Sequence, residues 1–385
     1  MSSRIWSLVI VAAALVLCAA QAFAEPPGFQ RNFTYKKSNG AVDIILGKQV
    51  VARYVYKDTP KPYIYPLLSQ LAIPVTRNYP MRTVAGEPTD HPHHRSFWIG
   101  FGDVNGVDFW SETDKSGKIV QTSLDFDPIA PGYWSIHTKN NWIGPDGKNI
   151  CDDDRKTAFY SCSYGTLIAS AITLNATKHK IKINDTKEGF FALRLAPSMA
   201  LKGGTGHILN SEGDKDAAAW GKRARWIDYT GEVNGQTCGI TIFDSPHNYG
   251  YPTYWHARDY GLLAANPFGG KAFTNDPKND SSLTVPYTGS IRLSYVVLIH
   301  DGLLDAATLD ALADNIAGRP KEAEKADQSK PADNNTTAIV NGKSVRVIKP
   351  MAPKPKHTPV KPTVKPIGKT TTPPPTASPA PSNND

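Results

Sequence analysis

The sequence predicts an all-β protein, an antiparallel β-sandwich with one short C-terminal helix. Six segments have the apolar–polar alternation or the β-branched and aromatic content of strands: 96–102, 167–174, 179–183, 190–195, 239–243 and 291–300. Turn sequences stand between strands, at Asn105-Gly106, Asp146-Gly147, Gly203-Gly204 and Asn234-Gly235. Only residues 305–317 have helical spacing, through Leu309, Leu312 and Ile316. Many short strands with one helix favour two sheets packed face to face.

The first 24 residues have the pattern of a secretory signal peptide. Arg4 precedes an apolar stretch at residues 5–20, and Ala22-Phe23-Ala24 supplies the small residues of a cleavage site. No later apolar run approaches the ~20 residues that a membrane-spanning helix needs. We therefore expect an exported protein without a membrane span, located in the periplasm or outside the cell.

Residues 320–385 have the composition of a disordered tail rich in Pro, Lys and Thr. From residue 331 onward there are twelve Pro, and seven Lys with one Arg against two Asp give +6 of the total formal charge of +8. Such a segment cannot bury enough apolar surface to fold, apart from a hairpin expected at residues 337–348 around Asn341-Gly342. We expect the tail to act as a spacer or to contact the cell envelope.

Residues 25–319 are predicted to form a single β-rich domain. With the tail and Arg4 set aside, this part is close to neutral, so it lacks the basic surface expected of a nucleic-acid-binding domain. Cys151 and Cys162 bracket a polar stretch that could be a loop, and export would permit a disulfide between them. Cys238 lies in a strand-like segment and is predicted to be a buried free thiol.

The densest group of chemically capable side chains is Asp-His-Pro-His-His-Arg at residues 90–95. An extended backbone would place His91 and His93 on one face and His94 on the other. Two imidazoles and a carboxylate could bind a transition metal, contact sugar hydroxyls, or fix the end of a strand. The spacing leaves these three interpretations open.

A second group lies at residues 251–261. If this segment is extended, Tyr254, His256 and Arg258 share one face and Trp255 lies on the other. Aromatic rings beside His and Arg suit a polar ligand with flat apolar faces, such as a sugar, although a tryptophan and a histidine packed in the core explain the pattern equally well.

Two glutamates outside the histidine groups are the best candidates for a general acid or base. They are Glu188, before a predicted strand, and Glu212, in an Asn-Ser-Glu-Gly segment. Either could instead form a salt bridge with Arg223 or Arg225. Both interpretations remain open from the sequence.

Long strings of the sequence resemble one family. They are residues 91–95 with 102–110, residues 208–213 with 219–224, and residues 251–261 with 264–269. Over residues 53–316 the chain is similar to exported bacterial proteins labelled PmoA-type methane oxygenase. The resemblance implies a mutarotase-like β-supersandwich and an association with carbohydrate. Phe101 stands where many of those relatives carry a histidine, so one possible metal ligand is absent. A metal site would then have only His91 and His93 as imidazole ligands.

These observations favour an exported, carbohydrate-directed enzyme that uses His and Glu acid–base chemistry on a glycan-derived substrate. The predicted catalytic residues are His94, His256 and Glu188, and the predicted substrate-binding residues are Asp103, Asp108, Trp110, Glu212, Trp255 and Arg258. No cofactor is expected, and the expected partner is a carbohydrate or another small polar ligand. Two alternatives remain: a metal-dependent oxidoreductase that uses His91 and His93, as the family label implies, and a carbohydrate-binding module without turnover.

The signal-peptide hypothesis predicts that the exported protein begins at Glu25, because cleavage follows Ala24. N-terminal sequencing of protein recovered from the periplasm or the medium tests this. Recovery of a chain that still begins at Met1, in the membrane fraction, would contradict it.

Overall fold

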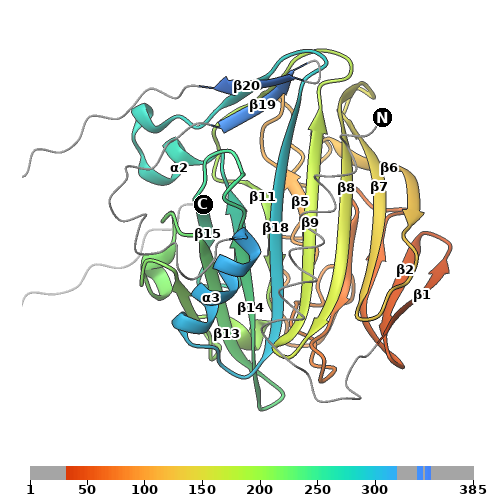
Figure 1. Ribbon diagram of the computed structural model, residues 1–385, viewed down its shortest axis with the longest axis vertical. Coiled ribbons are helices and arrows are strands. Elements are labelled where there is room, and N and C mark those ends of the chain that lie inside the picture. The colour runs from red at the N-terminus through yellow and green to blue at the C-terminus, as the bar shows by residue number, and fades with distance from the viewer. Residues whose placement is uncertain (1–31, 319–335, 341–342, 348–385) are drawn as a thin grey trace, which may run out of the picture. The chain divides into compact units, whose positions relative to one another are not determined.

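Two antiparallel sheets packed face to face form the described part of the chain, which confirms the predicted sandwich (Figure 1). The computed structural model describes residues 32–318, 336–340 and 343–347, all within one unit of the chain, Met1–Ile348. The predicted signal peptide and most of the predicted tail lie outside the described residues. The hairpin expected in the tail is present as two paired strands that flank residues 341–342.

The first sheet has eight strands in the order β1-β2-β3-β4-β5-β11-β16-β15. Its strands are β1 Phe33–Ser38, β2 Ala41–Leu46, β3 Gln49–Val55, β4 Tyr63–Leu67, β5 Phe97–Phe101, β11 Gly189–Arg194, β16 Leu262–Asn266 and β15 Tyr254–Ala257. Three segments far apart in the sequence, around residues 98, 192 and 264, therefore become neighbours in the middle of this sheet.

The second sheet has the order β12-β13-β14-β18-β9-β8-β7-β6, with β19 pairing with β18 and β20 pairing with β19. Its strands are β12 His207–Asn210, β13 Trp226–Val233, β14 Gln236–Asp244, β18 Ser290–Asp301, β9 Gly165–Asn175, β8 Asn149–Cys162, β7 Tyr133–Ile143, β6 Lys118–Phe126, β19 Thr336–Val340 and β20 Lys343–Val347. A two-stranded ribbon of β10 Ile181–Ile183 and β17 Leu283–Val285 is separate.

Short turns join many of these strands, and their sequences fit the backbone. Asn234 and Gly235, which connect β13 to β14, have φ values of 52° and 74°. Asn105 and Gly106 have φ values of 53° and 82°. Two successive residues with positive φ form the tight hairpin turn that Asn-Gly favours, because it matches the twist of the flanking strands. The Asn-Gly signals in the sequence therefore marked real turns.

Helix α3 (Ala306–Ala317) lies on the outer face of the second sheet (Figure 1). The Asp305 side chain accepts a hydrogen bond from the Thr308 backbone N–H, and Gly318 ends the helix in a left-handed conformation. Leu309 packs with Trp226 and Phe243 of the sheet. In the described part of the chain a second α-helix, α2 (Gly270–Thr274), is a single turn, and three 3₁₀ turns occupy Pro197–Met199, Asp216–Ala219 and Pro277–Asn279.

The polar stretch after Cys151 is not a loop. It belongs to β8, in which Asp153 and Arg155 point inward and form a buried ion pair at 2.6 Å. Cys151 and Cys162 stand near opposite ends of this strand, about 36 Å apart at the usual rise per residue, so they cannot form a disulfide with each other. Cys238 is buried and free in β14, as predicted.

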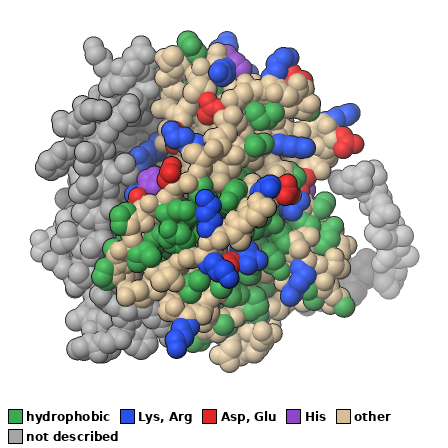
Figure 2. All heavy atoms as spheres, turned by 90° about the vertical axis from the view of Figure 1, so that its right-hand side faces the viewer, with side chains coloured by type: hydrophobic (Ala, Val, Ile, Leu, Met, Phe, Trp, Pro, Cys, Tyr) green, Lys and Arg blue, Asp and Glu red, His purple; other side chains and the backbone are tan. Residues whose placement is uncertain are grey.

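One face of the molecule carries the edge of the sandwich at β1, β2 and β6. Hydrophobic side chains reach the surface there among Lys and Arg side chains (Figure 2). Tyr35 is one of them, and its ring stacks on Phe126 at 4.4 Å. Among the described residues, none of the helices has the length and apolar character that crossing a bilayer requires.

Replacing Leu309 by alanine should lower the free energy of unfolding by about 2–5 kcal/mol, because its side chain is fully buried between α3 and the second sheet. Leu303→Ala is the matched control: Leu303 lies just before the helix, is 73% exposed, and should change stability by less than ~0.5 kcal/mol. Chemical denaturation measures both. Equal losses for the two variants would contradict the packing of α3.

Candidate functional site

A row of side chains crosses the outer face of the first sheet. The strand register places Trp98 beside Ala192, Ala192 beside Ala264, and Ala264 beside His256. Because successive side chains point to opposite faces, the residues next to them, such as Ile99 and Phe191, enter the main core instead. The two alanines in the middle of the row are small, so bulky side chains from the loops can pack over them. Trp110 is one of these.

The histidine segment before β5 is a turn and not an extended strand. The His94 backbone N–H donates to the His91 carbonyl at 3.0 Å, with Pro92 at the second position of the turn, where its fixed φ is favourable. The expectation that His94 would face away from His91 is therefore wrong. The His94 ring stacks on that of His91 at 4.7 Å and meets that of His93 at 4.5 Å.

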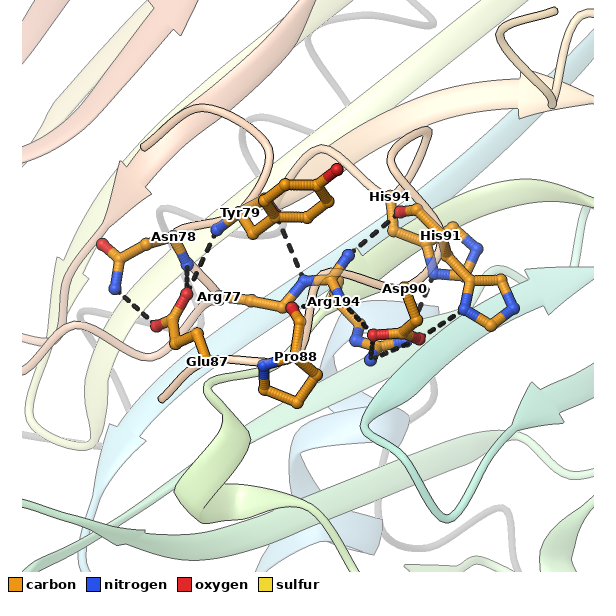
Figure 3. Close-up of polar contacts among 9 residues, drawn as sticks. All are labelled: Arg77, Asn78, Tyr79, Glu87, Pro88, Asp90, His91, His94 and Arg194. Atoms are coloured by element: carbon orange, nitrogen blue, oxygen red, sulfur yellow. Dashed lines mark hydrogen bonds and ion pairs between the residues drawn. The ribbon is translucent and has the colours of Figure 1, made fainter. Parts of the chain in front are cut away.

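Asp90 fixes this turn to the sheet (Figure 3). Its carboxylate accepts hydrogen bonds from Arg77 at 2.7 Å and from Arg194 of β11 at 3.1 Å, and it also contacts Nδ1 of His91. Partial burial raises the pKa of Asp90, but the hydrogen bond with His91 and the charges of the two arginines outweigh burial and hold that pKa below its usual value. Asp90 therefore stays ionised, and Nε2 is the ring nitrogen of His91 that Asp90 leaves free.

Tyr260, in the turn between β15 and β16, joins the histidine turn to the second sequence group. Its ring stacks on His91 at 5.0 Å, and the guanidinium groups of Arg194 and Arg258 lie 4.5 Å and 5.6 Å from its centre. Both distances are within the range of cation–π attraction. The two clusters singled out in the sequence thus meet on one face of one sheet.

A buried ion-pair group supports the other side of the turn. Glu112 pairs with Arg95 at 2.6 Å and with Lys61 at 3.3 Å. The Lys61 ammonium also donates to the Trp110 carbonyl. Burial lowers the pKa of Lys61 to about 8, although Glu112 acts against this shift. These contacts hold Trp110 and Arg95 in place beneath the histidines.

His256 lies at the far end of the row. Its side chain is buried, and burial together with the charges of Arg258 and Lys187 lowers its pKa to about 3, so the imidazole is neutral near neutral pH. Burial also lowers the pKa of His93 to about 4 and that of His94 well below its usual value. The histidines at these three positions can accept or donate hydrogen bonds without carrying charge.

Glu188 is a partly exposed carboxyl group that interacts electrostatically with His91 of the first cluster and Arg258 of the second. It precedes β11, and its side chain is 33% exposed. Burial raises the pKa of Glu188 above its usual value, while Lys187, His91 and Arg258 lower it and Asp108 raises it further. A carboxyl group with a raised pKa keeps its proton to higher pH, which suits a general acid.

Several buried nitrogen atoms at this face have no hydrogen-bond partner among the described residues. They are Nε1 of Trp98, Trp110 and Trp220, Nε of Arg194, and Nδ1 of His256. Buried polar groups in folded proteins are nearly always paired, so such a concentration is unusual. Four of the five are N–H donors, and they favour a ligand rich in acceptor oxygens.

Three of the predicted site residues lie away from the histidine turn. Asp103 accepts hydrogen bonds from Gly106 and Asn184 and stabilises a turn at the end of β5. Glu212 lies in the turn after β12, where Ser211 donates to it, and among the described residues it makes no hydrogen bond or ion pair with a histidine. Trp255 faces the main core and donates to the Ala224 carbonyl at 3.0 Å. Its ring is therefore not placed to stack on a ligand at the outer face.

Two further predicted residues lie at the site in supporting positions. Trp110 is only 1% exposed and packs beneath His93 and His94, so its ring face is covered. Asp108 accepts hydrogen bonds from the backbone N–H groups of Trp110 and Ser111. Arg223 and Arg225 pair with neither candidate glutamate. The first donates to backbone carbonyls near Tyr251, and the second pairs with Asp310 and Asp314.

The sequence interpretation missed Arg77, Lys61 and Arg194, which carry no local motif; only Arg194 lies in a predicted strand. Tyr260 lay within the second sequence group, but the sequence interpretation gave it no role. Within the described residues, no group of three or more His, Cys, Asp or Glu side chains is arranged to hold a metal ion. A surface cleft of about 480 Å³, lined by Tyr56, Lys57 and Lys118 among others, contains none of the clustered groups. We place the candidate site at the histidine turn because titratable groups with shifted pKa values converge there.

A family model matches residues 41–314 of the chain, which is most of the sandwich. It describes a family of unknown function, DUF6807. The chain belongs to the DUF6807 family. The resemblance to PmoA-type methane oxygenase was therefore wrong, and the oxidoreductase activity implied by that label loses its basis. No curated protein matches the sequence of this DUF6807 chain.

Solved structures similar to the DUF6807 chain include a glycoside hydrolase family 97 enzyme in complex with acarbose, from Pseudoalteromonas sp. strain K8. The TM-score is 0.35 at 8% identity, over 71% of this chain and 35% of that one, so this chain spans about a third of its length. A galactose 1-epimerase from Lactobacillus acidophilus has a TM-score of 0.34 at 7% identity, over 71% and 99%. A galactose mutarotase-like protein from Clostridium acetobutylicum has a TM-score of 0.31 at 10% identity, over 71% and 99%. These likenesses carry no conclusion about the activity of the DUF6807 chain.

The lowered pKa of His256 predicts a pH dependence of stability. Between pH 6.5 and about 3 the unfolded chain binds a proton at this histidine and the folded chain does not, so this contribution to stability is complete above pH 6.5 and is lost as the pH falls. In that window, His256→Gln should reduce the slope of unfolding free energy against pH by up to about 1.4 kcal/mol per pH unit. Denaturant titrations at several pH values measure the slope. His179→Gln, which removes an exposed imidazole, is the control, and identical slopes in wild type and His256→Gln would refute the prediction.

Proposed function

We propose that this protein is a carbohydrate-active enzyme in which His91 and Glu188 exchange protons with the substrate. The observation that carries the proposal is the contact of Asp90 with Nδ1 of His91, at a site that also contains a partly exposed carboxyl group of raised pKa. A carboxylate that holds one ring nitrogen fixes the orientation of the ring and leaves Nε2 for proton transfer. On the basis of residues 1–24, we also propose that the protein acts outside the cytoplasm.

The two groups suit complementary roles. His91 is 40% exposed, and its neighbour His94 is 1% exposed, so His91 is the better placed of the two to reach a ligand. Glu188 is the corresponding acid, because its raised pKa favours the protonated carboxyl group. His256 is neutral and has an unpaired Nδ1, which suits a hydrogen bond to a substrate hydroxyl. In this arrangement His94 and Asp90 are positioning residues.

The surroundings favour a sugar over an apolar ligand. Sugars present many hydroxyl oxygens and flat C–H faces, and they are bound by N–H donors and aromatic rings. Unpaired N–H donors of Trp98, Trp110 and Arg194 lie at this face, and Tyr260 and Trp220 are half-buried rings at its edge. An apolar ligand would offer no acceptor to unpaired N–H groups at this face, whereas a ligand rich in oxygen atoms would.

The test is binding and turnover of a glycan panel by the wild type, His91→Gln and Glu188→Gln. Both variants should bind with little change in affinity but lose at least ~10²-fold in kcat, since proton transfer by a positioned group contributes 10²–10⁴-fold. His179→Gln should behave as wild type. Calorimetry measures binding, and NMR of the sugar measures turnover.

The outcomes separate the alternatives. Binding without turnover by the wild type would contradict the enzyme proposal and favour a carbohydrate-binding module. Absence of binding to every glycan would contradict the carbohydrate proposal itself. Wild-type turnover by Glu188→Gln would remove Glu188 from the mechanism.

A further inference from the structure

Arg258 lies at the edge of the candidate site, and its guanidinium has aromatic neighbours but no ion-pair partner among the described residues. It follows β15, and its backbone N–H donates to the Leu262 carbonyl at 2.8 Å. Its side chain lies 5.9 Å from the ring centre of Trp220 and 5.6 Å from that of Tyr260. Within the same described residues, no acceptor takes a hydrogen bond from this guanidinium.

The other arginines of the site differ in this respect. Arg77 and Arg194 pair with Asp90, and Arg95 pairs with Glu112. Arg258 is also half-buried, so its guanidinium is only partly hydrated. The two aromatic rings restrict its conformations, and less freedom is then lost when it binds a ligand. The N–H groups of Arg258 are thus held in one orientation and can donate to an acceptor on a ligand.

The pairing of charges at the site sets Arg258 apart. Asp90 pairs with Arg77 and Arg194, Glu112 pairs with Arg95 and Lys61, and Lys187 lies 3.8 Å from Glu188. Each of these basic groups has a carboxylate nearby within the protein, and Arg258 pairs with none among the described residues. A neutral sugar would leave the Arg258 guanidinium without an anionic partner in a partly desolvated place.

We infer that the substrate of the proposed enzyme carries a carboxylate, as a uronic acid does, and that Arg258 binds it through two parallel N–H···O bonds. The inference rests on the proposed function, since it names the class of sugar that the same site accepts. A planar carboxylate matches the planar fork of arginine, and such pairs are short and strong. The unpaired Nε1 of Trp220, beside Arg258, offers a further donor to the same group.

The experiment compares each uronic acid with its neutral counterpart: glucuronate with glucose, and galacturonate with galactose. For at least one pair, wild-type protein should bind the acid at least tenfold more tightly by calorimetry, and this preference should weaken as salt is added. Arg258→Gln should abolish the preference, so that the acid and the neutral sugar bind with equal affinity. Arg258→Lys should keep part of it, because the charge remains and the fork is lost. Arg53→Gln, at an exposed position of β3, is the control and should keep all of it.

Each result decides one proposal. Equal affinity for the acid and the neutral sugar in every pair would overturn the carboxylate inference and leave the proposed function standing. A preference that persists in a folded Arg258→Gln variant would overturn the role of Arg258; thermal unfolding shows whether that variant is folded. Acetate binding as tightly as the uronic acids would overturn sugar recognition. Binding of no sugar in any pair would overturn the proposed function and the inference with it.

Discussion

The carboxylate of Asp90 is the contact on which the candidate site depends. Arg77 and Arg194 have side chains that are 0% and 3% exposed, and a buried guanidinium is strongly unfavourable unless it is paired. Asp90 pairs with both and also holds His91. Because Arg194 belongs to the centre of the first sheet, this one side chain attaches the histidine turn to the rigid part of the fold. The positions of the imidazoles follow from that attachment.

Alternate residues along each strand of the first sheet face either the main core or the candidate site. In β15, Trp255 faces the main core and His256, one residue later, faces the site. In β5, Ile99 and Trp98 divide in the same way. Both tryptophans are fully buried, yet only Trp98 keeps an unpaired N–H. The outer face of the first sheet is therefore a second, smaller packed layer that contains polar groups.

The polar groups of this face contrast with one network of the second sheet. There the carboxylate of Asp153 accepts hydrogen bonds from Asn140, Trp142 and Arg155. At the candidate site, several N–H donors and the Arg258 guanidinium have no such acceptor among the described residues. Unpaired buried atoms also occur elsewhere, such as Nε1 of Trp134 and the hydroxyl of Tyr295. What sets the candidate site apart is that its unpaired donors lie beside titratable side chains with shifted pKa values.

Local signals in the sequence determined the strands of the sandwich centre, the Asn-Gly turns and helix α3, because strand alternation, turn chemistry and helix capping act over a few residues. The turn at His91 also has a local signal in Pro92, because proline at the second position favours a turn. The strand β8 was not predicted because its charged residues suggested a loop. Asp153 and Arg155 fit a buried strand only because they form an ion pair with each other in the folded protein. The site itself was decided by tertiary structure. Asp90 and Arg194 are 104 residues apart, and Tyr260 meets His91 only because β11 and β16 are neighbours. Which face of β15 is core and which is site depends on the sheet packed against it, and no single strand carries that information.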